Sequence, residues 1–266
     1  AAGHSLTLVN RGRTDAAVPA GVRRVACDAR DIDALADAVG REEWDVVVQW
    51  IGFVPEHVQA DIDVFRGRVG QYIFISSATV YEKPPSQYLI TEATPRGNPF
   101  SPYAQNKIAC EDVLMEAYQR EGFPVTIVRP SYTYGQTKIP ADISVTDYTL
   151  AARMKAGKPV IAHGDGETLW TLTHNTDFAK GFVGLFGKMD AYGDAFNIVS
   201  DEVLTWNAIY RCVGAAVGVE PEIVHVPSDI ICEMWPDRRA GLFGDKMYSM
   251  VFDCSKVRKL APEFEC

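Results

Sequence analysis

The sequence has few basic residues for its acidic content. Its 266 residues contain 26 lysines and arginines against 35 aspartates and glutamates, which gives a formal net charge of −9. Proteins that bind nucleic acids usually neutralise the phosphates with a basic face. A nucleic-acid partner is therefore disfavoured, although a local basic patch remains an open alternative.

Paired cysteines and long apolar runs are also missing. The six cysteines are scattered, with no C-x-x-C pair and no histidine at metal-binding spacing. We therefore predict reduced thiols, a cytoplasmic location and no metal site. The most apolar segment, residues 46–54, falls well short of the roughly 20 residues that a membrane helix needs. No signal peptide is evident, so we expect no membrane partner.

Strand patterns alternate with helix patterns through the first half of the chain. Short runs of apolar or β-branched residues predict strands, and apolar residues at helical spacing predict helices between them. The strands are expected at 5–9, 23–26, 45–50, 71–75 and 125–129, and the helices at 32–39, 55–69 and 103–121. This alternation predicts an α/β fold with a Rossmann-type, doubly wound parallel sheet covered on both faces.

The alternation of strand and helix patterns ends after Pro130, and loops rich in glycine and proline follow. Helical stretches are still expected at 147–156, 175–186 and 206–217. We predict a sheet domain of residues 1–130, to which 175–200 return. A smaller substrate lobe is expected from 131–174 and 201–266.

One constellation of polar residues suggests acid/base chemistry. Ser77 follows a buried strand, and Tyr103 and Lys107 are four residues apart, which places them on one face of a helix. A free tyrosine has a pKa of about 10, and a neighbouring ammonium favours the phenolate. We therefore predict Tyr103 as a general acid/base whose pKa is lowered by Lys107. The competing interpretation is an amphipathic helix that happens to carry both residues.

With their flanking motifs, these residues resemble the extended short-chain dehydrogenase/reductase family, in its nucleotide-sugar epimerase and dehydratase group. The resemblance covers nearly the whole chain. The ordered set that carries it consists of Ser77, Tyr103-x-x-x-Lys107, Arg129-Pro130, Tyr134-Gly135, Gly164-Asp165-Gly166, Thr173-His174, Asp177, Gly244-Asp245, Asp253 and Ser255-Lys256.

The resemblance implies a catalytic set of Ser77, Tyr103 and Lys107. Ser77 would hydrogen-bond the reacting hydroxyl or carbonyl, and Lys107 would also hold the nicotinamide ribose. Tyr103 would move the proton while the cofactor takes or gives a hydride.

It also implies cofactor-binding roles for Asn10, Arg11, Asp28 and Arg129, with NAD or NADP as the cofactor. The loop after the strand at 5–9 contains Arg11 and Arg13 and no carboxylate, which favours NADP slightly. A solvated turn is the alternative for this loop. Asp28 matches the acidic residue that contacts adenine in the family, and its alternative role is the N-cap of the helix at 32–39.

The family's opening strand and its glycine-rich phosphate loop have no counterpart in this sequence. That strand lies in the middle of the family's sheet, and its absence would leave unpaired strand edges. We therefore expect about 20 to 30 further residues before Ala1, the size of a strand, a turn and a helix. The family usually also continues with a final helix after the point where this sequence stops.

The resemblance assigns substrate contacts to Thr79, Tyr132 and Trp170. Dehydratases of the group have Asp-Glu where this chain has Ala78-Thr79, so dehydration is disfavoured. Nucleotide-sugar enzymes generally have an asparagine in place of Tyr132 and an arginine in place of Trp170, and both hold the diphosphate region. Loss of the guanidinium is not a neutral change. Trp170 could stack on a sugar or base, or belong to the core of the lobe.

The leading hypothesis is an NAD(P)-dependent epimerase/oxidoreductase acting on a sugar, possibly a nucleotide sugar. A second is a non-catalytic RNA-binding relative, because the chain also resembles the chloroplast stem-loop-binding proteins. A third is a ketoreductase of a small metabolite. The family commonly forms homodimers through the helices corresponding to 55–69 and 103–121, so a homodimer is possible.

Overall fold

The centre of the fold is a four-stranded parallel sheet. The computed structural model describes residues 3–13, 18–142 and 148–266. The strand order is β10-β6-β4-β3, and all three strand pairs are parallel. The four strands are β3 (Trp44–Gln49), β4 (Val69–Ile75), β6 (Val125–Pro130) and β10 (Asp194–Ile198). The predicted α/β fold with a parallel sheet is confirmed.

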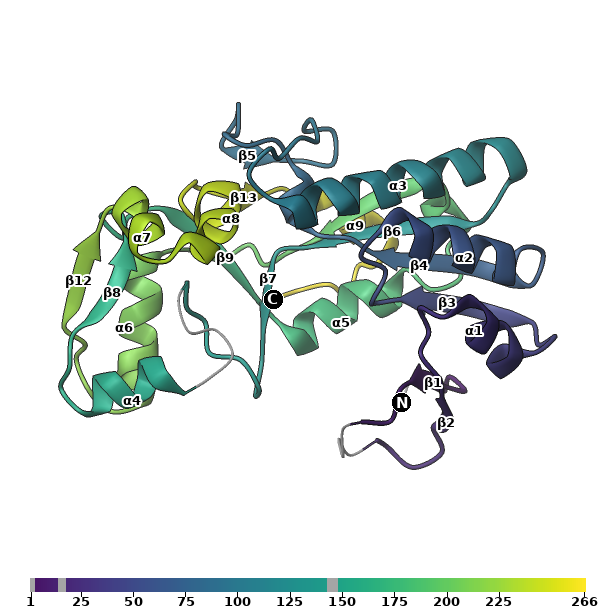
Figure 1. Ribbon diagram of the computed structural model, residues 1–266, viewed down its shortest axis with the longest axis horizontal. Helices are drawn as coiled ribbons and strands as arrows, with labels where there is room; N and C mark the ends of the chain where they lie inside the picture. The colour runs from purple at the N-terminus through teal and green to yellow at the C-terminus, as the bar shows by residue number, and fades with distance from the viewer. Residues whose placement is uncertain (1–2, 14–17, 143–147) are drawn as a thin grey trace.

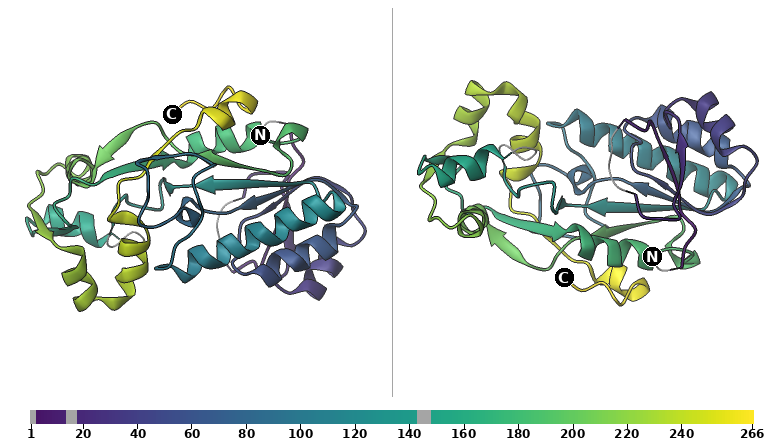
Figure 2. Two further views of the ribbon diagram at one scale, coloured as in Figure 1. Left: turned by 90° about the horizontal axis from the view of Figure 1, so that it is seen from above. Right: turned by 90° about the horizontal axis from the view of Figure 1, so that it is seen from below.

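Helices cover both faces of this sheet, as the views from above and below show (Figure 2). One face carries α1 (Ile32–Val39), α2 (Pro55–Phe65) and α3 (Pro102–Glu121), and the other carries α5 (Asn175–Gly184) and α9 (Ser255–Leu260). β4 and β6 are therefore buried from both sides over most of their length. This explains why their sequences are almost continuously apolar.

The first two strands form a separate parallel pair. β1 (Thr7–Asn10) pairs with β2 (Arg23–Ala26) residue for residue. Within the described residues, neither strand is hydrogen-bonded to the four-stranded sheet. In Figure 1 the pair lies on the β3 side of that sheet.

One predicted helix is shorter than expected. The apolar positions from residue 55 onward continue at helical spacing to Val69, but α2 ends at Phe65 and Val69 is the first residue of β4. Gly67 has φ +68°, a left-handed conformation that glycine adopts readily. The chain therefore reverses at Gly67, and the prediction of one helix over 55–69 is wrong.

The second lobe is built from small sheets and short helices at the left of Figure 1. A three-stranded sheet has the order β11-β9-β7, and β8 pairs in parallel with β12. Its strands are β7 (Tyr132–Tyr134), β8 (Val160–His163), β9 (Leu169–His174), β11 (Val203–Thr205) and β12 (Ile223–Val226). Its main helices are α4 (Thr149–Lys155), α6 (Trp206–Ala216) and α7 (Ser228–Met234). Asp147, where a helix was expected to begin, lies outside the described residues.

Short elements join the lobe to the sheet domain. The two-residue strand β5 (Leu89–Ile90) pairs with β13 (Val251–Phe252), and a π-helical turn, η4 (Leu242–Lys246), precedes β13. β10 returns from the second half of the chain to pair with β6. None of the helices in the described segments combines the length and the apolar character that a membrane span needs.

Candidate active site

Helix α3 carries two of the three predicted catalytic residues. Ser101 caps it by accepting a hydrogen bond from the backbone N–H of Ala104, and Pro102 occupies its first turn. Both features are typical of a helix start. The helix therefore begins one residue before Tyr103, which is 42% exposed, and runs inward past Lys107, which is 1% exposed.

Lys107 is anchored at the carboxyl ends of two strands. Its Nζ donates to the backbone oxygens of Gly52, at 2.8 Å, and Ile75, at 2.7 Å. The ammonium also lies 4.5 Å from the centre of the Phe74 ring, a favourable cation–π distance. Burial lowers the pKa of Lys107 to about 8. Two of its three N–H groups are used, so one donor remains for a ligand.

Ser77 and Tyr103 lie together at the mouth of the sheet. The Ser77 Oγ accepts hydrogen bonds from the Thr79 backbone N–H, at 3.2 Å, and from its Oγ1, at 2.9 Å. Burial raises the pKa of Tyr103, a hydrogen bond with Ser77 lowers it, and the negative charge of Asp245 raises it further. The Lys107 ammonium lies 5.7 Å from the centre of the Tyr103 ring and is held by two carbonyls. The lowering of the Tyr103 pKa by Lys107 stays a prediction.

These three side chains line one cavity of about 630 Å³. It opens between the carboxyl ends of β3, β4 and β6 and helix α5. Its lining consists of Trp50, Ile75, Ser76, Ser77, Tyr103, Lys107, Pro130, Ser131, Thr133, Asn175, Phe178, Ala179, Phe182 and Val183. The structure thus brings Ser77, Tyr103 and Lys107 to a single concave surface, as is usual for small-molecule sites.

A buried ion pair supports the Ser77 loop from behind. Glu111, one helical turn after Lys107, accepts a hydrogen bond from the Ser76 hydroxyl at 2.6 Å. Arg129 binds the same carboxylate with Nε at 3.0 Å and Nη2 at 2.6 Å, and its Nη1 donates to the Tyr81 hydroxyl at 3.1 Å. Arg129 is 5% exposed and does not line the cavity. Its observed partners are Glu111 and Tyr81, and the predicted cofactor contact stays a prediction.

A second buried carboxylate shapes the loop that holds Lys107. Asp61 on α2 accepts from the Gln49 amide at 2.6 Å and from the Tyr72 hydroxyl at 2.5 Å. Gln49 in turn accepts from the backbone N–H of Ile51 at 2.8 Å. This bond holds the residue directly before Gly52, whose carbonyl binds Lys107. Burial raises the pKa of Asp61 to about 6.

Asn98 connects the loop of Ser77 and Thr79 to the second lobe. Its Nδ2 donates to the backbone oxygen of Thr79 at 2.8 Å and to that of Gly244 at 2.7 Å. A Cβ added at Gly244 would lie 3.1 Å from the Ser101 Cβ, so the η4 turn packs tightly against the start of α3. Sequence reasoning missed Asn98 because nothing in its spacing marks it. Glu111 could have been found, since it follows Lys107 by four residues on the same helix face.

The predicted adenosine contacts gather at the carboxyl ends of β1 and β2. The Arg11 Nη1 lies 3.9 Å from the Asp28 Oδ2, and the Asn10 Oδ1 accepts a hydrogen bond from the backbone N–H of Gly12 at 2.9 Å. A hydrogen bond from the Arg30 side chain lowers the pKa of Asp28 to about 2. Arg11 and Arg13 are exposed. None of these residues lines the cavity that holds Tyr103.

The alternative role of Asp28 as a helix cap is wrong. The N-cap of α1 is Asp31, whose carboxylate accepts from the backbone N–H of Ala34 at 3.1 Å. Asp28 instead binds Arg30 through both its backbone N–H and its guanidinium. The sequence places two aspartates near the helix start, and the one directly before it caps the helix, as N-cap geometry requires.

The predicted substrate contacts are placed unequally. Thr79 stays beside Ser77, but Trp170 is only 1% exposed and stacks on Trp206 with ring centres 5.3 Å apart. Trp170 therefore belongs to the lobe core, and the predicted stacking on a ligand is corrected. Tyr132 is 9% exposed, and its hydroxyl donates to the backbone oxygen of Ala141 at 2.9 Å.

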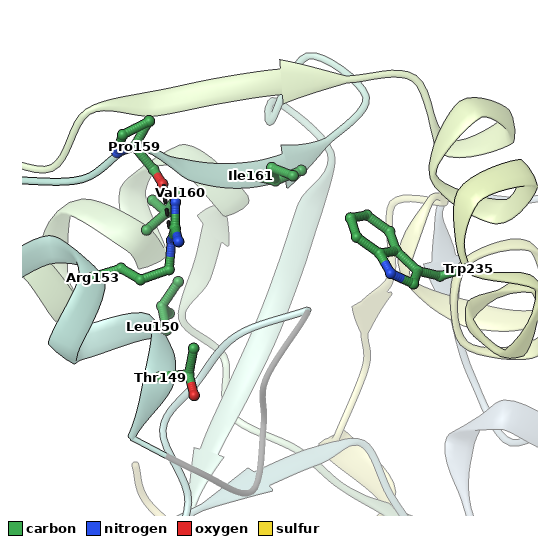
Figure 3. A pocket seen from close by; sticks show the side chains of 7 residues that line it. All are labelled: Thr149, Leu150, Arg153, Pro159, Val160, Ile161 and Trp235. Carbon is green, nitrogen blue, oxygen red and sulfur yellow. Dashed lines mark hydrogen bonds between the residues drawn. The ribbon is translucent and has the colours of Figure 1, made fainter.

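A smaller cavity of about 290 Å³ lies in the second lobe (Figure 3). Arg153 and Trp235 face it from opposite sides. The Arg153 guanidinium is already engaged, because its Nε and Nη2 donate to the backbone oxygen of Pro159 at 3.2 and 2.8 Å. Among the residues that the structure describes, no other charged side chain lines it. This cavity therefore lacks the acid/base groups of the larger one.

Comparisons with known proteins find a matching family model and similar sequences. Residues 1–198 match the model of the NAD dependent epimerase/dehydratase family. The chain is 28% identical to 2'-dehydrokanamycin reductase of Streptomyces kanamyceticus, over all of this chain and 74% of that protein. It is also 28% identical to the chloroplast stem-loop binding protein of 41 kDa b of Arabidopsis thaliana, over 84% of this chain and 60% of that protein.

Among solved structures, a UDP-glucuronic acid 4-epimerase from Bacillus cereus, in complex with UDP-glucuronic acid and NAD, superposes with a TM-score of 0.72. It is 18% identical, and the match covers 94% of this chain and 78% of that one. The similarity therefore concerns the fold.

Proposed function

This chain belongs to the NAD dependent epimerase/dehydratase family, and we propose that it is an NAD(P)-dependent oxidoreductase acting on a sugar, with Tyr103 as the acid/base. The observation that supports this most is the convergence of Ser77, Tyr103 and Lys107 on one cavity of about 630 Å³. The family supplies the type of cofactor, and the cavity supplies the groups that would move the proton.

The residues around the cavity fit a nicotinamide cofactor. Lys107 has one N–H group that no described residue uses, and we propose that it donates to a ribose hydroxyl. The half-exposed Trp50 and the phenyl ring of Phe178 give the same cavity an aromatic wall. When bound, such a cofactor supplies or accepts a hydride. The exposed Arg11 and Arg13 remain our reason to favour NADP.

The state of Tyr103 favours reduction as the productive direction. Burial raises the pKa of Tyr103, the hydrogen bond with Ser77 lowers it, and the charge of Asp245 raises it further, so the net shift favours the protonated phenol. A protonated phenol donates to a carbonyl oxygen as that oxygen gains negative charge. Ser77, hydrogen-bonded to Tyr103, would hold the same oxygen in place. We therefore propose reduction of a keto sugar, with epimerisation as the variant in which the hydride returns to the opposite face.

The named relatives support a sugar-type substrate. The reductase from Streptomyces kanamyceticus acts, by its name, on a dehydro derivative of kanamycin, and the Bacillus cereus epimerase holds UDP-glucuronic acid. Whether the sugar of this chain carries a nucleotide is part of the proposal. Ala78 and Thr79, where dehydratases have Asp-Glu, continue to argue against water elimination.

A second candidate function is RNA binding, which the similarity to the chloroplast stem-loop binding protein favours. The net charge of −9 argues against it. A gel-shift experiment with structured RNA at physiological salt tests this candidate. Salt-sensitive binding without any cofactor affinity would replace our proposal.

The main test is cofactor binding followed by turnover. Titration of the full-length protein with NADH and NADPH should change the nicotinamide fluorescence, and failure to bind either would refute the enzyme proposal. Tyr103→Phe should bind cofactor normally but lower turnover by about 10²- to 10⁴-fold. Tyr88→Phe is the matched control, because it removes the same hydroxyl from a side chain that is 76% exposed. Unchanged turnover in Tyr103→Phe would contradict the mechanism.

Two further proposals concern the setting of the enzyme. All six cysteines are free, which supports a reducing compartment and hence the cytoplasm. Helices α2 and α3 lie next to each other on one face of the sheet (Figure 1). We propose this pair as the surface of a homodimer, which sedimentation of the purified protein would test.

A further inference from the structure

One wall of the main cavity is made of uncharged polar side chains. Ser131 and Thr133 belong to the stretch in which the chain leaves β6 for β7, and Asn175 is the first residue of α5. Together they offer two hydroxyl groups and one carboxamide, which can both donate and accept hydrogen bonds. Ser131 and Thr133 are partly buried and Asn175 is exposed, so all three can exchange water for groups of a ligand.

These three side chains lie close together. Ser131 and Thr133 both line the cavity, whereas Tyr132 between them is buried and does not, which is the alternation of an extended chain. β7 pairs with β9, and Asn175 follows β9 directly. A Cβ added at Gly135, two residues after Thr133, would lie 2.5 Å from the Asn175 Nδ2. The carboxamide therefore rests on the backbone at the end of β7, beside the two hydroxyls.

The polar groups of this wall do not hold the fold together. Across residues 3–13, 18–142 and 148–266, no partner is hydrogen-bonded to the side chain of Ser131, Thr133 or Asn175. The hydroxyl of Thr173, on the neighbouring strand β9, is different, because it is buried and accepts from the backbone N–H of Ser200 at 2.8 Å. The three groups that face the cavity are therefore available to a ligand.

The described lining of the cavity has almost no charge. Its only charged side chain is Lys107, and it contains neither an arginine nor a carboxylate. Lys107 is 1% exposed and already donates to the backbone oxygens of Gly52 and Ile75, and we assign its remaining N–H group to the cofactor. An ionised substrate group that entered the cavity would lose its hydration without gaining a partner of opposite charge, which is unfavourable.

The charged residues closest to this wall do not supply the missing cations. Lys138 and Lys246 have their Nζ atoms 4.1 and 5.9 Å from the centre of the Tyr132 ring, and neither lysine lines the cavity. The carboxylate of Asp245 lies 3.6 Å from the Lys246 ammonium. Besides burial, the negative charge of Asp245 raises the pKa of Tyr103. The field at the reacting end therefore also disfavours a phosphoryl group or a carboxylate.

We propose that Ser131, Thr133 and Asn175 bind the hydroxyl groups of a neutral sugar, one that carries neither a phosphate nor a nucleotide. Sugar hydroxyls donate and accept hydrogen bonds, and so do the groups that this wall offers. A diphosphate is usually held by charged donors such as arginine, which the described lining lacks. This inference rests on the proposed function for the reaction at Tyr103, but the binding of the sugar can be tested without turnover.

The test compares neutral and charged forms of the same sugars on the full-length protein. Saturation-transfer NMR titrations give the dissociation constants, and saturating NADP⁺ keeps nucleotide probes out of the cofactor site. The neutral probes are D-glucose, D-galactose and D-mannose. The charged probes are their 6-phosphates, UDP-glucose, UDP-galactose, GDP-mannose and, as a cation, D-glucosamine. We expect at least one neutral sugar to bind, and to bind more tightly than every charged probe.

Three variants make the test specific to the proposed wall. Thr133→Val removes one hydroxyl at nearly constant shape and should weaken binding of the neutral sugar about 3- to 10-fold, the usual value of one neutral hydrogen bond. Ser131→Ala and Asn175→Leu should have effects of similar size. The denaturation midpoint and the cofactor affinity of Thr133→Val should stay unchanged, which separates lost recognition from a damaged fold. Thr137→Val, at an exposed threonine outside the cavity, is the matched control and should change none of these values.

Three outcomes would overturn this inference. They are no binding of any neutral sugar at millimolar concentration, tighter binding of a charged probe than of all three neutral sugars, and an equal loss of affinity in Thr133→Val and Thr137→Val. None of them affects the proposed function, which depends on NADH or NADPH binding and on Tyr103. Failure of cofactor binding, conversely, would refute the proposed function. The comparison of the neutral sugars with their 6-phosphates needs no cofactor and would still decide the inference.

Discussion

The two sides of the main cavity differ in how they are assembled. The catalytic wall, formed by Ser77, Tyr103 and Lys107, comes from one strand end and the helix that follows it. Each of its polar groups is tied to the backbone or to a neighbouring hydroxyl. The recognition wall that we propose, formed by Ser131, Thr133 and Asn175, comes from β7 with the residue before it and from the start of α5.

The difference separates chemistry from recognition. Groups that move protons must keep fixed positions relative to a cofactor, so they are held by short connections and buried hydrogen bonds. Groups that select a substrate complete their bonding only when the substrate arrives. On this view, changes in the catalytic wall affect the rate, whereas changes in the recognition wall affect which molecule is accepted.

Substitution of the tryptophans of the second lobe should have the largest effect on stability, and it checks whether Trp170 belongs to the recognition wall at all. Trp170→Ala should lower the free energy of unfolding by about 3–5 kcal/mol, because it leaves a large cavity beside Trp206. Trp235→Ala, at a side chain that is 44% exposed, should change it by less than about 1 kcal/mol. Denaturant melts of both variants measure this. A small effect of Trp170→Ala would return that residue to the list of substrate contacts.

The stability of the protein should depend on pH through Asp61, which lies behind the catalytic wall that we propose. Its pKa is raised from 3.8 to about 6, so the folded state holds a proton that the unfolded state releases in between. The stability that it contributes is present below about pH 4 and is lost as the pH rises through 6. Asp61→Asn should therefore gain about 3 kcal/mol relative to wild type between pH 4 and pH 7.5. If the difference in unfolding free energy between Asp61→Asn and wild type is the same at pH 4 and at pH 7.5, this prediction is wrong.

Lys107 links the catalytic wall to the cofactor, and its removal should have a smaller but still large effect. Lys107→Met should weaken NADH or NADPH binding about 10- to 100-fold, the usual value of a charged hydrogen bond. Because the pKa of Lys107 is lowered to about 8, the wild-type affinity should fall as the pH rises through 8. Fluorescence titrations from pH 6.5 to 9.5 measure both effects. The variant should show no such pH dependence, and a parallel decline would assign it to another group.

The smallest expected effect concerns the choice of cofactor, away from both walls. Arg11→Ser should reduce the preference for NADPH over NADH about fivefold, or ~1 kcal/mol, because the guanidinium is exposed and its charge is screened by solvent. Arg24→Ser, at an exposed arginine of β2, is the matched control. An unchanged ratio of the two dissociation constants would favour the solvated-turn interpretation of this loop.

Much of the sheet domain could be predicted from the sequence. β4 and β6 are buried on both faces, so their apolar runs are nearly continuous, and α3 is bounded by a serine cap and Gly122. The end of α2 was misjudged because Val69, at helical spacing from Phe65, is apolar for a different reason: it opens the next strand. Periodicity alone does not distinguish these two causes.

The placement of Ser77, Tyr103 and Lys107 around one cavity could be predicted because they are close in the sequence. Tyr103 and Lys107 share a helix, and Ser77 ends the strand beneath it, so local spacing was enough. Arg129 and Trp170 were assigned to ligands because of their family positions, but burial gives them a glutamate and a tryptophan as partners. Lys138 and Lys246 both lie near the Tyr132 ring only because of how the second lobe folds, and no pattern in the sequence predicts this.

The amide of Asn98 has a consequence for engineering this protein. The Asn98 Nδ2 group donates hydrogen bonds to the backbone oxygen of Thr79, in the loop after β4, and to that of Gly244, in the η4 turn. Segments of the second lobe exchanged with those of a relative would therefore need to preserve the small residue at Gly244 and the carbonyl with which it accepts from Asn98. A chimera that respects this junction should inherit the donor's substrate range and keep the recipient's proton-transfer groups in register.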